Sequence, residues 1–238
     1  MIPTALRVLR QLRHDPRTAA LLVFVPPLLM VLLRYVFDDK RTFSHIAPAL
    51  LGIFPFLLMF LVTSIATLRE RTSGTLERLM TTPLAKLSLL AGYGLAFALV
   101  AIVQVGVTTG VCFALGMSID GSLGWLLVVT LGDALLGVAL GLLGSAFART
   151  EFQAIQLMPV VVLPQLLVCG LFQPRSEMAT VLQWAADVLP VPYAVEALQH
   201  VAGSTSVDGG FARDLLVLAG FVVAGVVAAA GTLRRRTA

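Results

Sequence analysis

Apolar positions along the chain gather into six long runs that are separated by short polar stretches. A helix that crosses about 30 Å of hydrocarbon needs about 20 apolar residues, and each run is long enough. Lipid offers no partner to free backbone groups, so each run is expected to be a helix. The pattern predicts an all-α polytopic membrane protein with six transmembrane helices, over 18–37, 46–68, 87–117, 123–148, 152–172 and 211–233.

Composition supports a membrane protein. The 238 residues are 58% hydrophobic and 13% charged, whereas soluble domains have about 45–50% apolar and about 25% charged residues. This excludes a soluble enzyme, a disordered chain and a secreted disulfide scaffold. The net charge of +4 is interpreted as membrane topology, and no nucleic-acid partner is expected.

Basic residues orient the predicted spans. Twelve of the 17 Lys and Arg residues lie before the first span, between the second and third, between the fourth and fifth, or after the sixth. The positive-inside rule therefore predicts that both termini and the 69–86 loop are cytoplasmic. The Arg-, Ala- and Val-rich composition suggests a bacterial chain in the cytoplasmic (plasma) membrane.

Two segments outside the spans have helical patterns. Residues 1–16 alternate apolar and Arg positions at helical spacing, which indicates an amphipathic helix in the headgroup plane; the alternative is a solvated lead-in. His14, Asp15 and Pro16 are expected to end it. The 173–210 segment is expected to form an outer re-entrant helical pair with Trp184 and Tyr193 as interface anchors.

Motifs for chemistry are missing. The chain has no G-x-x-x-x-G-K-[ST] phosphate loop, no H-E-x-x-H and no G-x-S-x-G elbow. Its three histidines lie in separate segments and predict no metal cluster. We therefore expect no enzyme activity and no cofactor in this chain, and any work must draw its energy from elsewhere.

The 69–86 loop holds the densest charge cluster of the chain. Gly74 and Pro83 bracket a stretch in which Leu76, Leu79 and Met80 share one helical face. Such a short amphipathic helix can dock into a groove on a soluble partner. Composition alone also allows a solvated loop between spans.

The residues from Arg69 to Leu84 read R-E-R-x-x-G-T-L-E-x-L-x-x-T-P-L. This stretch resembles the signature of type-2 ABC transporter permeases, with every element present. Pro190 to Leu198 is similar to the P-x-x-Y-x-V-[DE]-A-L sequence of the same family, although Gln199 stands where the family often has Arg. The resemblance covers the whole chain, and the loop motif is its most specific part.

The resemblance implies an exporter subunit for a hydrophobic or amphipathic cargo such as a drug, lipid or glycoconjugate. Two permease subunits, identical or paralogous, would enclose the pathway, and two separate ATPase subunits would bind ATP and Mg. The loop would be the coupling helix that is seated on the ATPase. The residues carried over to that role are Glu70, Arg71, Gly74, Thr75, Leu76, Glu77, Arg78 and Leu79.

Polar residues inside spans are candidates for the pathway. Asp133 lies near the middle of the fourth span, where it can contact substrate, act as a proton-linked switch or serve as a hydrogen-bonded packing residue. Gln153 and Gln156 share one face of the fifth span and either line a cavity or bond between helices.

Two further patterns lie in the second and fourth spans. Phe56, Met59 and Phe60 either contact an apolar cargo or pack against other helices. Gly137 and Gly141 form a G-x-x-x-G motif that permits close approach of another helix.

Three alternatives to an exporter remain. An ion-coupled secondary transporter would need coupling groups such as Asp133 and would leave the loop motif unexplained. A non-transporting sensor or assembly component would bind an ATPase without cargo-stimulated hydrolysis. A membrane-embedded enzyme lacks the catalytic motifs.

Overall fold

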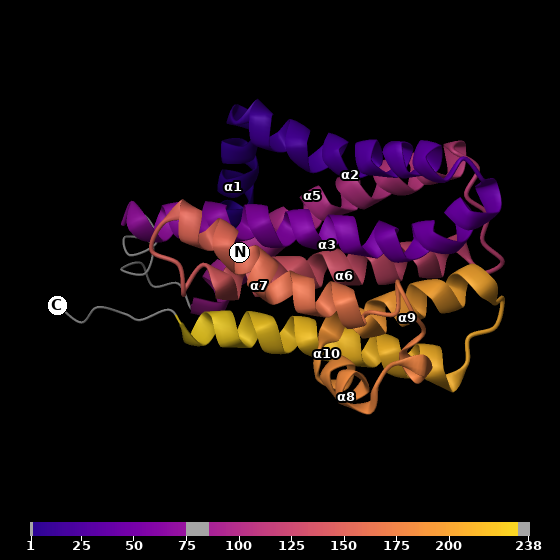
Figure 1. Cartoon of the computed structure of the whole chain (residues 1–238). Helices are drawn as coiled ribbons and strands as arrows, with labels where there is room; N and C mark the ends of the chain where they lie inside the picture. Colours follow the sequence, from indigo (N-terminus) through magenta and orange to yellow (C-terminus); the bar gives the residue numbers. More distant parts are fainter. Residues whose placement is uncertain (1, 75–85, 233–238) are drawn as a thin grey trace.

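The fold was analysed in a computed structural model, which describes residues 2–74 and 86–232 (Figure 1). Within those residues the chain is helical and has no strand, which confirms the expected all-α polytopic fold. Six helices are long and apolar enough to cross a membrane. They are α2 (Pro16–Phe37), α3 (Lys40–Thr72), α5 (Lys86–Ala114, apolar from Leu89), α6 (Leu123–Gly144), α7 (Glu151–Val168) and α10 (Gly209–Gly231).

The helix ends differ from the predicted span ends. α3 extends beyond 46–68 at both ends. It starts early because the Asp39 side chain accepts a hydrogen bond from the Thr42 amide at 2.8 Å and caps the helix. α5 stops at Ala114 rather than 117, near Gly116 at φ +93°. α6 and α7 stop about four residues before the predicted ends. An apolar run marks the part in lipid, whereas capping groups and glycines set the helix ends.

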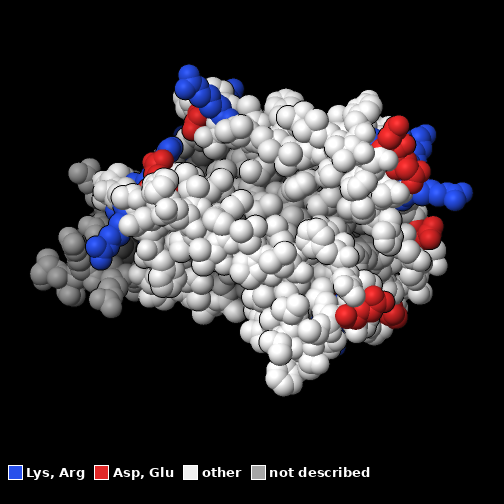
Figure 2. Space-filling model, viewed as in Figure 1, with Lys and Arg blue, Asp and Glu red and all other residues white. Residues whose placement is uncertain are grey.

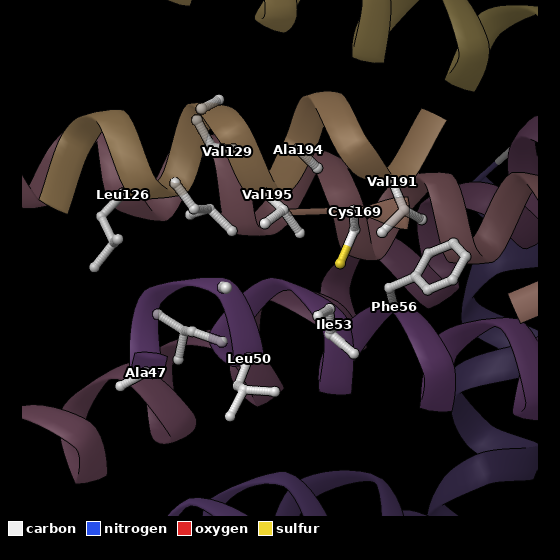
Figure 3. Packing of buried hydrophobic residues seen from close by; sticks show 14 of the residues in the cluster. Ala47, Leu50, Ile53, Phe56, Leu126, Val129, Cys169, Val191, Ala194 and Val195 are labelled. Carbon is white, nitrogen blue, oxygen red and sulfur yellow. The ribbon is translucent and has the colours of Figure 1, made fainter. Parts of the chain in front are cut away.

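α3 and α6 form the centre of the bundle. A Cβ atom on Gly137 would lie 2.4 Å from the Phe56 carbonyl oxygen, and one on Gly141 would lie 2.6 Å from that of Phe60. The G-x-x-x-G motif therefore lets α6 rest on the backbone of α3, as predicted. Figure 3 shows the apolar side chains of α3, including Leu50, that pack beside this crossing.

The 173–210 segment forms the short helices η1 (Arg175–Glu177), α8 (Thr180–Val188) and α9 (Pro190–Gly203). α9 is mostly buried against α3, α6 and α10 in the half of the bundle away from the termini (Figure 1). α8 leaves Trp184 exposed. Tyr193 is not an interface anchor, because it is buried and its hydroxyl donates to the Asp187 carbonyl oxygen at 2.8 Å.

The N-terminal helix α1 (Ile2–His14) is separated from α2 by a single residue. Asp15 caps α2 by accepting hydrogen bonds from the hydroxyl and the amide of Thr18, at 2.7 and 3.2 Å. These bonds hold the pKa of the Asp15 carboxyl below its ordinary value, so the cap stays ionised at neutral pH. The predicted end of the first helix at His14 is confirmed.

Charged side chains occupy the two ends of the bundle, and the face in Figure 2 shows a broad uncharged band between them. The end with α1 and the last turn of α10 also holds the last turn of α3, and the opposite end holds the α2–α3 connection (Figure 1). This separation fits a chain whose middle lies in hydrocarbon and whose ends reach water.

Candidate coupling site at the end of α3

The last turn of α3 carries three consecutive charged residues, Arg69, Glu70 and Arg71. Successive residues of an α-helix point about 100° apart, so three neighbours point to different sides. Accordingly, each of the three side chains bonds to a different part of the bundle.

Glu70 points into the protein. Its side chain is buried, and its Oε2 atom accepts a hydrogen bond from Nη2 of Arg7 at 2.6 Å and another from the hydroxyl of Tyr93. The same Arg7 nitrogen lies 2.5 Å from the Tyr93 oxygen. Arg7 comes from α1 and Tyr93 from α5, so one carboxylate joins three helices. Charge-assisted bonds of this kind are among the strongest hydrogen bonds in proteins.

Arg69 and Arg71 reach two other helices. The Nε and Nη2 atoms of Arg69 donate to the two carboxylate oxygens of Glu151, at 2.6 and 2.9 Å. Arg71 donates to the hydroxyl of Thr232 at 3.1 Å. Glu151 begins α7 and Thr232 caps α10. The end of α3 is therefore bonded to α1, α5, α7 and α10.

The chain leaves α3 through Gly74, whose φ of +71° is left-handed. Glycine adopts this conformation without a steric cost, and it commonly ends a helix. A Cβ atom on Gly74 would meet no atom within 4 Å. The predicted coupling residues Thr75, Leu76, Glu77, Arg78 and Leu79 lie outside the described residues, so their helix remains a prediction.

Glu70 and Arg71 were assigned to the coupling helix, a role that stays a prediction, and in the structure both side chains bond to other helices of the chain. Sequence reasoning missed Tyr93 because it stands as a lone tyrosine in an apolar run. A buried phenol needs a hydrogen-bond partner, which was the available signal. Arg7, one of the arginines of the predicted amphipathic helix, turns inward to reach Glu70.

α1 is a helix, as predicted, and it buries one side against the bundle. Thr4, Ala5 and Val8 are buried, and Ile2 and Leu6 are exposed. On the same helix, Arg7 pairs with Glu70 of α3. The exposed apolar pair lies on a helix that also carries arginines, which is the pattern of an interfacial helix.

The predicted pathway residues divide into core and surface. Phe56, Met59 and Phe60 are at most 1% exposed in the described structure, so they pack in the core and do not line a pathway within the single chain. Gln153 and Gln156 are exposed at the start of α7. They line a hollow of about 430 Å³ on the surface of the chain.

Asp133 is fully buried at the α3–α6 crossing. A Cβ atom on Gly52 would lie 3.0 Å from its Oδ2 and 2.6 Å from Cδ1 of Leu198 on α9. Neither carboxylate oxygen has a hydrogen-bond partner among residues 2–74 and 86–232. Within that part of the chain, Asp133 therefore lacks the hydrogen bonds that a packing role would use.

The amino-acid sequence of the chain is similar to those of several known proteins. The chain is 27% identical over 164 residues to ABC transporter G family member 20 of Dictyostelium discoideum, covering 68% of this chain and 22% of the relative. It is 27% identical over 178 residues to the probable multidrug ABC transporter permease YbhS of Escherichia coli, covering 74% of this chain and 47% of the relative.

A third relative is the probable multidrug ABC transporter permease YbhR of Escherichia coli, 26% identical over 159 residues, which are 66% of this chain and 43% of YbhR. The chain therefore spans less than half the length of these relatives. Residues 4–202 match the ABC-2 type transporter family, a match that includes α1, the end of α3 and α9. The chain belongs to the ABC-2 type transporter family.

Proposed function

We propose that this chain is the membrane-spanning permease subunit of an ATP-driven exporter, with ATP and Mg bound by separate ATPase subunits. The observation that carries the proposal is the end of α3, where the Arg69–Glu70–Arg71 turn bonds to four other helices. A loop that receives force from outside needs such a base, because otherwise its movement would be lost in local bending.

In this proposal, the bonds of Arg69, Glu70 and Arg71 carry the movement of the turn to other helices. When an ATPase moves the 75–85 segment, the turn moves with it and pulls α7 through Glu151 and α10 through Thr232. Glu70 carries α1 and α5 along through Arg7 and Tyr93. The coupling residues Leu76 and Leu79 supply the apolar anchor on the ATPase, and Glu77 and Arg78 set the register by charge pairing.

The assembly contains two ATPase subunits and a second permease copy, either identical or paralogous. Both termini and the coupling segment lie on the cytoplasmic side of a bacterial plasma membrane, in agreement with the excess of arginines at that end. α2, α5, α7 and α10 leave large apolar side chains exposed and are available to the second copy and to lipid.

The cargo is hydrophobic or amphipathic. Charged groups are scarce in the middle of the bundle, and the two Escherichia coli relatives are named as probable multidrug permeases. The exposed Gln153 and Gln156 offer hydrogen bonds to such a cargo where α7 faces the second copy.

Co-purification tests the coupling. The full chain is co-expressed with candidate ATPases from its genome, especially any encoded beside it, and is extracted in mild detergent. We expect one ATPase to co-purify in stoichiometric amount. The double substitution Leu76→Asp plus Leu79→Asp should abolish its retention, because two charges in an apolar groove are strongly disfavoured.

The matched control is Val181→Asp plus Val188→Asp. These two valines are exposed on α8, away from the termini, so this variant should retain the ATPase. Retention by both double variants would contradict the coupling helix. A folded chain that binds no member of a complete set of ATPases would remove the energy source of the proposed exporter.

One observation favours a second candidate, an ion-coupled transporter. Asp133 is a buried carboxylate without a hydrogen-bond partner in the described residues, as an ion-coupling group would be. Transport that survives ATP depletion and is lost in Asp133→Asn would support this candidate. Transport that stops on ATP depletion and continues in Asp133→Asn would support the exporter.

A further inference from the structure

A cavity of about 410 Å³ lies where α1 turns into α2, against the sides of α3 and α5. Its volume is within the range of small-molecule sites, about 300–1,000 Å³. Its walls come from four helices, so residues far apart in the sequence build it. Arg69 and Glu70 of the coupling turn belong to the wall, and the other lining residues take no part in the bonds of that turn.

The lining is divided by polarity. α3 supplies an apolar wall with Val62, Ile65 and Ala66, and Phe97 of α5 completes it. The polar residues come from α1, the α1–α2 junction, the first turn of α2 and the last turn of α3. A ligand that satisfies both parts of the lining has an apolar body and a polar head.

The polar part of the lining carries more negative than positive charge. It holds the carboxylates of Asp15 and Glu70 and one cation, Arg69. Two of these groups already have a partner from outside the lining, since Arg7 pairs with Glu70 and Glu151 pairs with Arg69. When these partners are counted, three carboxylates face two guanidinium groups, so one negative charge has no counterion.

The unbalanced charge is that of Asp15. Its carboxylate accepts hydrogen bonds from the hydroxyl and the amide of Thr18, at 2.7 and 3.2 Å, and forms no ion pair within residues 2–74 and 86–232. Arg69 attracts Asp15 from a distance but donates its Nε and Nη2 hydrogens to Glu151. The positive head of a ligand would therefore supply the missing counterion.

Glu70 offers a further acceptor in the same lining. The hydrogen bonds that it receives from Arg7 and Tyr93 both end on Oε2. Its Oε1 atom accepts no hydrogen bond from the described part of the chain. An ammonium group has up to three hydrogens to donate and no acceptor. It therefore suits a lining in which carboxylate oxygens still lack donors.

The other arginines of this region do not balance the charge in the cavity. Arg10 and Arg13 lie on the face of α1 opposite to Val8 and Leu12, which line the cavity. Arg17 is exposed in the first turn of α2. A helix is about 10 Å wide, and salt screens exposed charges over about 8 Å. These three charges therefore act mainly on the solvent.

We propose that this cavity binds an amphipathic monocation, with an ammonium head against Asp15 and Glu70 and an apolar body against α3 and Phe97. Such a ligand contacts α1, α2 and the coupling turn at once. The proposal does not rest on transport, so it is tested by binding alone, and its failure would leave the exporter proposal untouched.

The test compares three probes that share one apolar body. They are naphthylbutylamine, naphthylbutanol and naphthylbutyrate, whose heads are positive, neutral and negative at neutral pH. Isothermal titration calorimetry measures their binding to the full chain in phosphatidylcholine nanodiscs, with empty nanodiscs as the blank. We expect one amine to bind at least about tenfold more tightly than the alcohol, because hydrogen bonds to a charged group contribute that much. The acid should bind more weakly than the alcohol.

Asp15→Asn removes the unbalanced charge and keeps a residue that caps helices well. It should weaken binding of the amine by about tenfold and leave binding of the alcohol unchanged. The matched control is Asp39→Asn. Asp39 caps α3 in the same way, accepting from the amide and the hydroxyl of Thr42 at 2.8 and 2.7 Å, but lies at the opposite end of the bundle. This control should bind all three probes as the original chain does.

Ala66→Trp tests where the probe binds, because the larger side chain fills the cavity beside the α3 wall. It should weaken binding of the amine and of the alcohol by about tenfold or more. Its control is Ala224→Trp, the same exchange at an exposed position on α10, which should change neither. If Ala66→Trp does not fold, the two asparagine variants still decide the proposal.

Three results would overturn the proposal. The first is equal affinity of the original chain for the amine and the alcohol. The second is an Asp15→Asn variant that keeps its preference for the amine, or that loses no more of it than Asp39→Asn does. The third is a folded Ala66→Trp variant that binds the amine as tightly as the original chain.

Discussion

α3 is held in two different ways along its length. Its middle lies against α6, where Gly137 and Gly141 bring backbone to backbone. Its last turn is held by charged side chains that reach α1, α5, α7 and α10. The close contact between the α3 and α6 backbones is rigid and leaves no room for water. The ion pairs at the end of α3 lie near water, so they can break and form again. The middle therefore fixes the fold, and the end can transmit a change.

The substitution with the largest expected effect is Gly137→Leu. The new side chain would start 2.4 Å from the Phe56 carbonyl oxygen, so α6 must move off α3. We expect the free energy of unfolding to fall by about 3 kcal/mol or more, at the upper end for overpacked cores. Thermal unfolding and the monodisperse fraction in gel filtration measure it. A variant as stable as the original chain would show that backbone contact does not hold the middle.

Glu70→Gln tests the end of α3 and ranks second. The amide keeps the shape but removes the charge that Arg7 and Tyr93 share, which should cost about 2 kcal/mol. Protease sensitivity of α1 should rise with it. In a double-mutant cycle, Arg7→Gln should add little to Glu70→Gln, because the two residues form one interaction. If the losses in stability of the two variants were fully additive, Arg7 of α1 and Glu70 of the coupling turn would not stabilise each other.

Arg69→Gln should have a smaller effect at the same turn. The Arg69–Glu151 pair is about half exposed, with side-chain exposures of 58% and 49%, and exposed pairs contribute about 0–1 kcal/mol. The loss should shrink as salt screens the pair. Thermal unfolding at low and at high ionic strength measures it. A large loss that salt does not change would mean that the pair acts as a buried one.

The smallest effect is expected for Gly220→Leu on α10. A Cβ atom on Gly220 would meet no atom within 4 Å in the described chain, so the change should alter the stability of the single chain by no more than about 0.5 kcal/mol. Gly220→Leu replaces the same residue type by the same residue type as Gly137→Leu does, so it serves as its control. Equal losses in the two variants, compared by thermal unfolding, would show that Leu disfavours any helix position here and that contact is not the cause.

The sequence predicted the fold from apolar runs, because lipid forces such runs into helices. It also predicted the close approach at Gly137, although not that the partner is α3. Gly220 carries the same kind of signal but meets no neighbour in the described chain. A small residue indicates that two helices can meet, and only the arrangement of the bundle decides whether they do.

The site was harder to predict. The motif located the turn at Arg69 and Glu70, but its bonds depend on residues that lie 63 and 82 positions away in the chain. Phe56 was a candidate for the pathway because an aromatic side chain in an apolar run looks the same whether it faces cargo, lipid or core. Its side chain is buried in the packed bundle, and periodicity alone does not reveal that packing.

α3 also contains Pro48 and Pro55, both in the half of the helix before the Phe56 contact. Proline removes a helical hydrogen bond and permits bending, while the stretch from Phe56 to Thr72 contains no proline and forms a stiff rod of about 24 Å. The Gly137 contact then serves as a pivot, and the arm of α3 beyond it ends at the coupling turn. A tilt of about 5° about this point displaces that turn by about 2 Å.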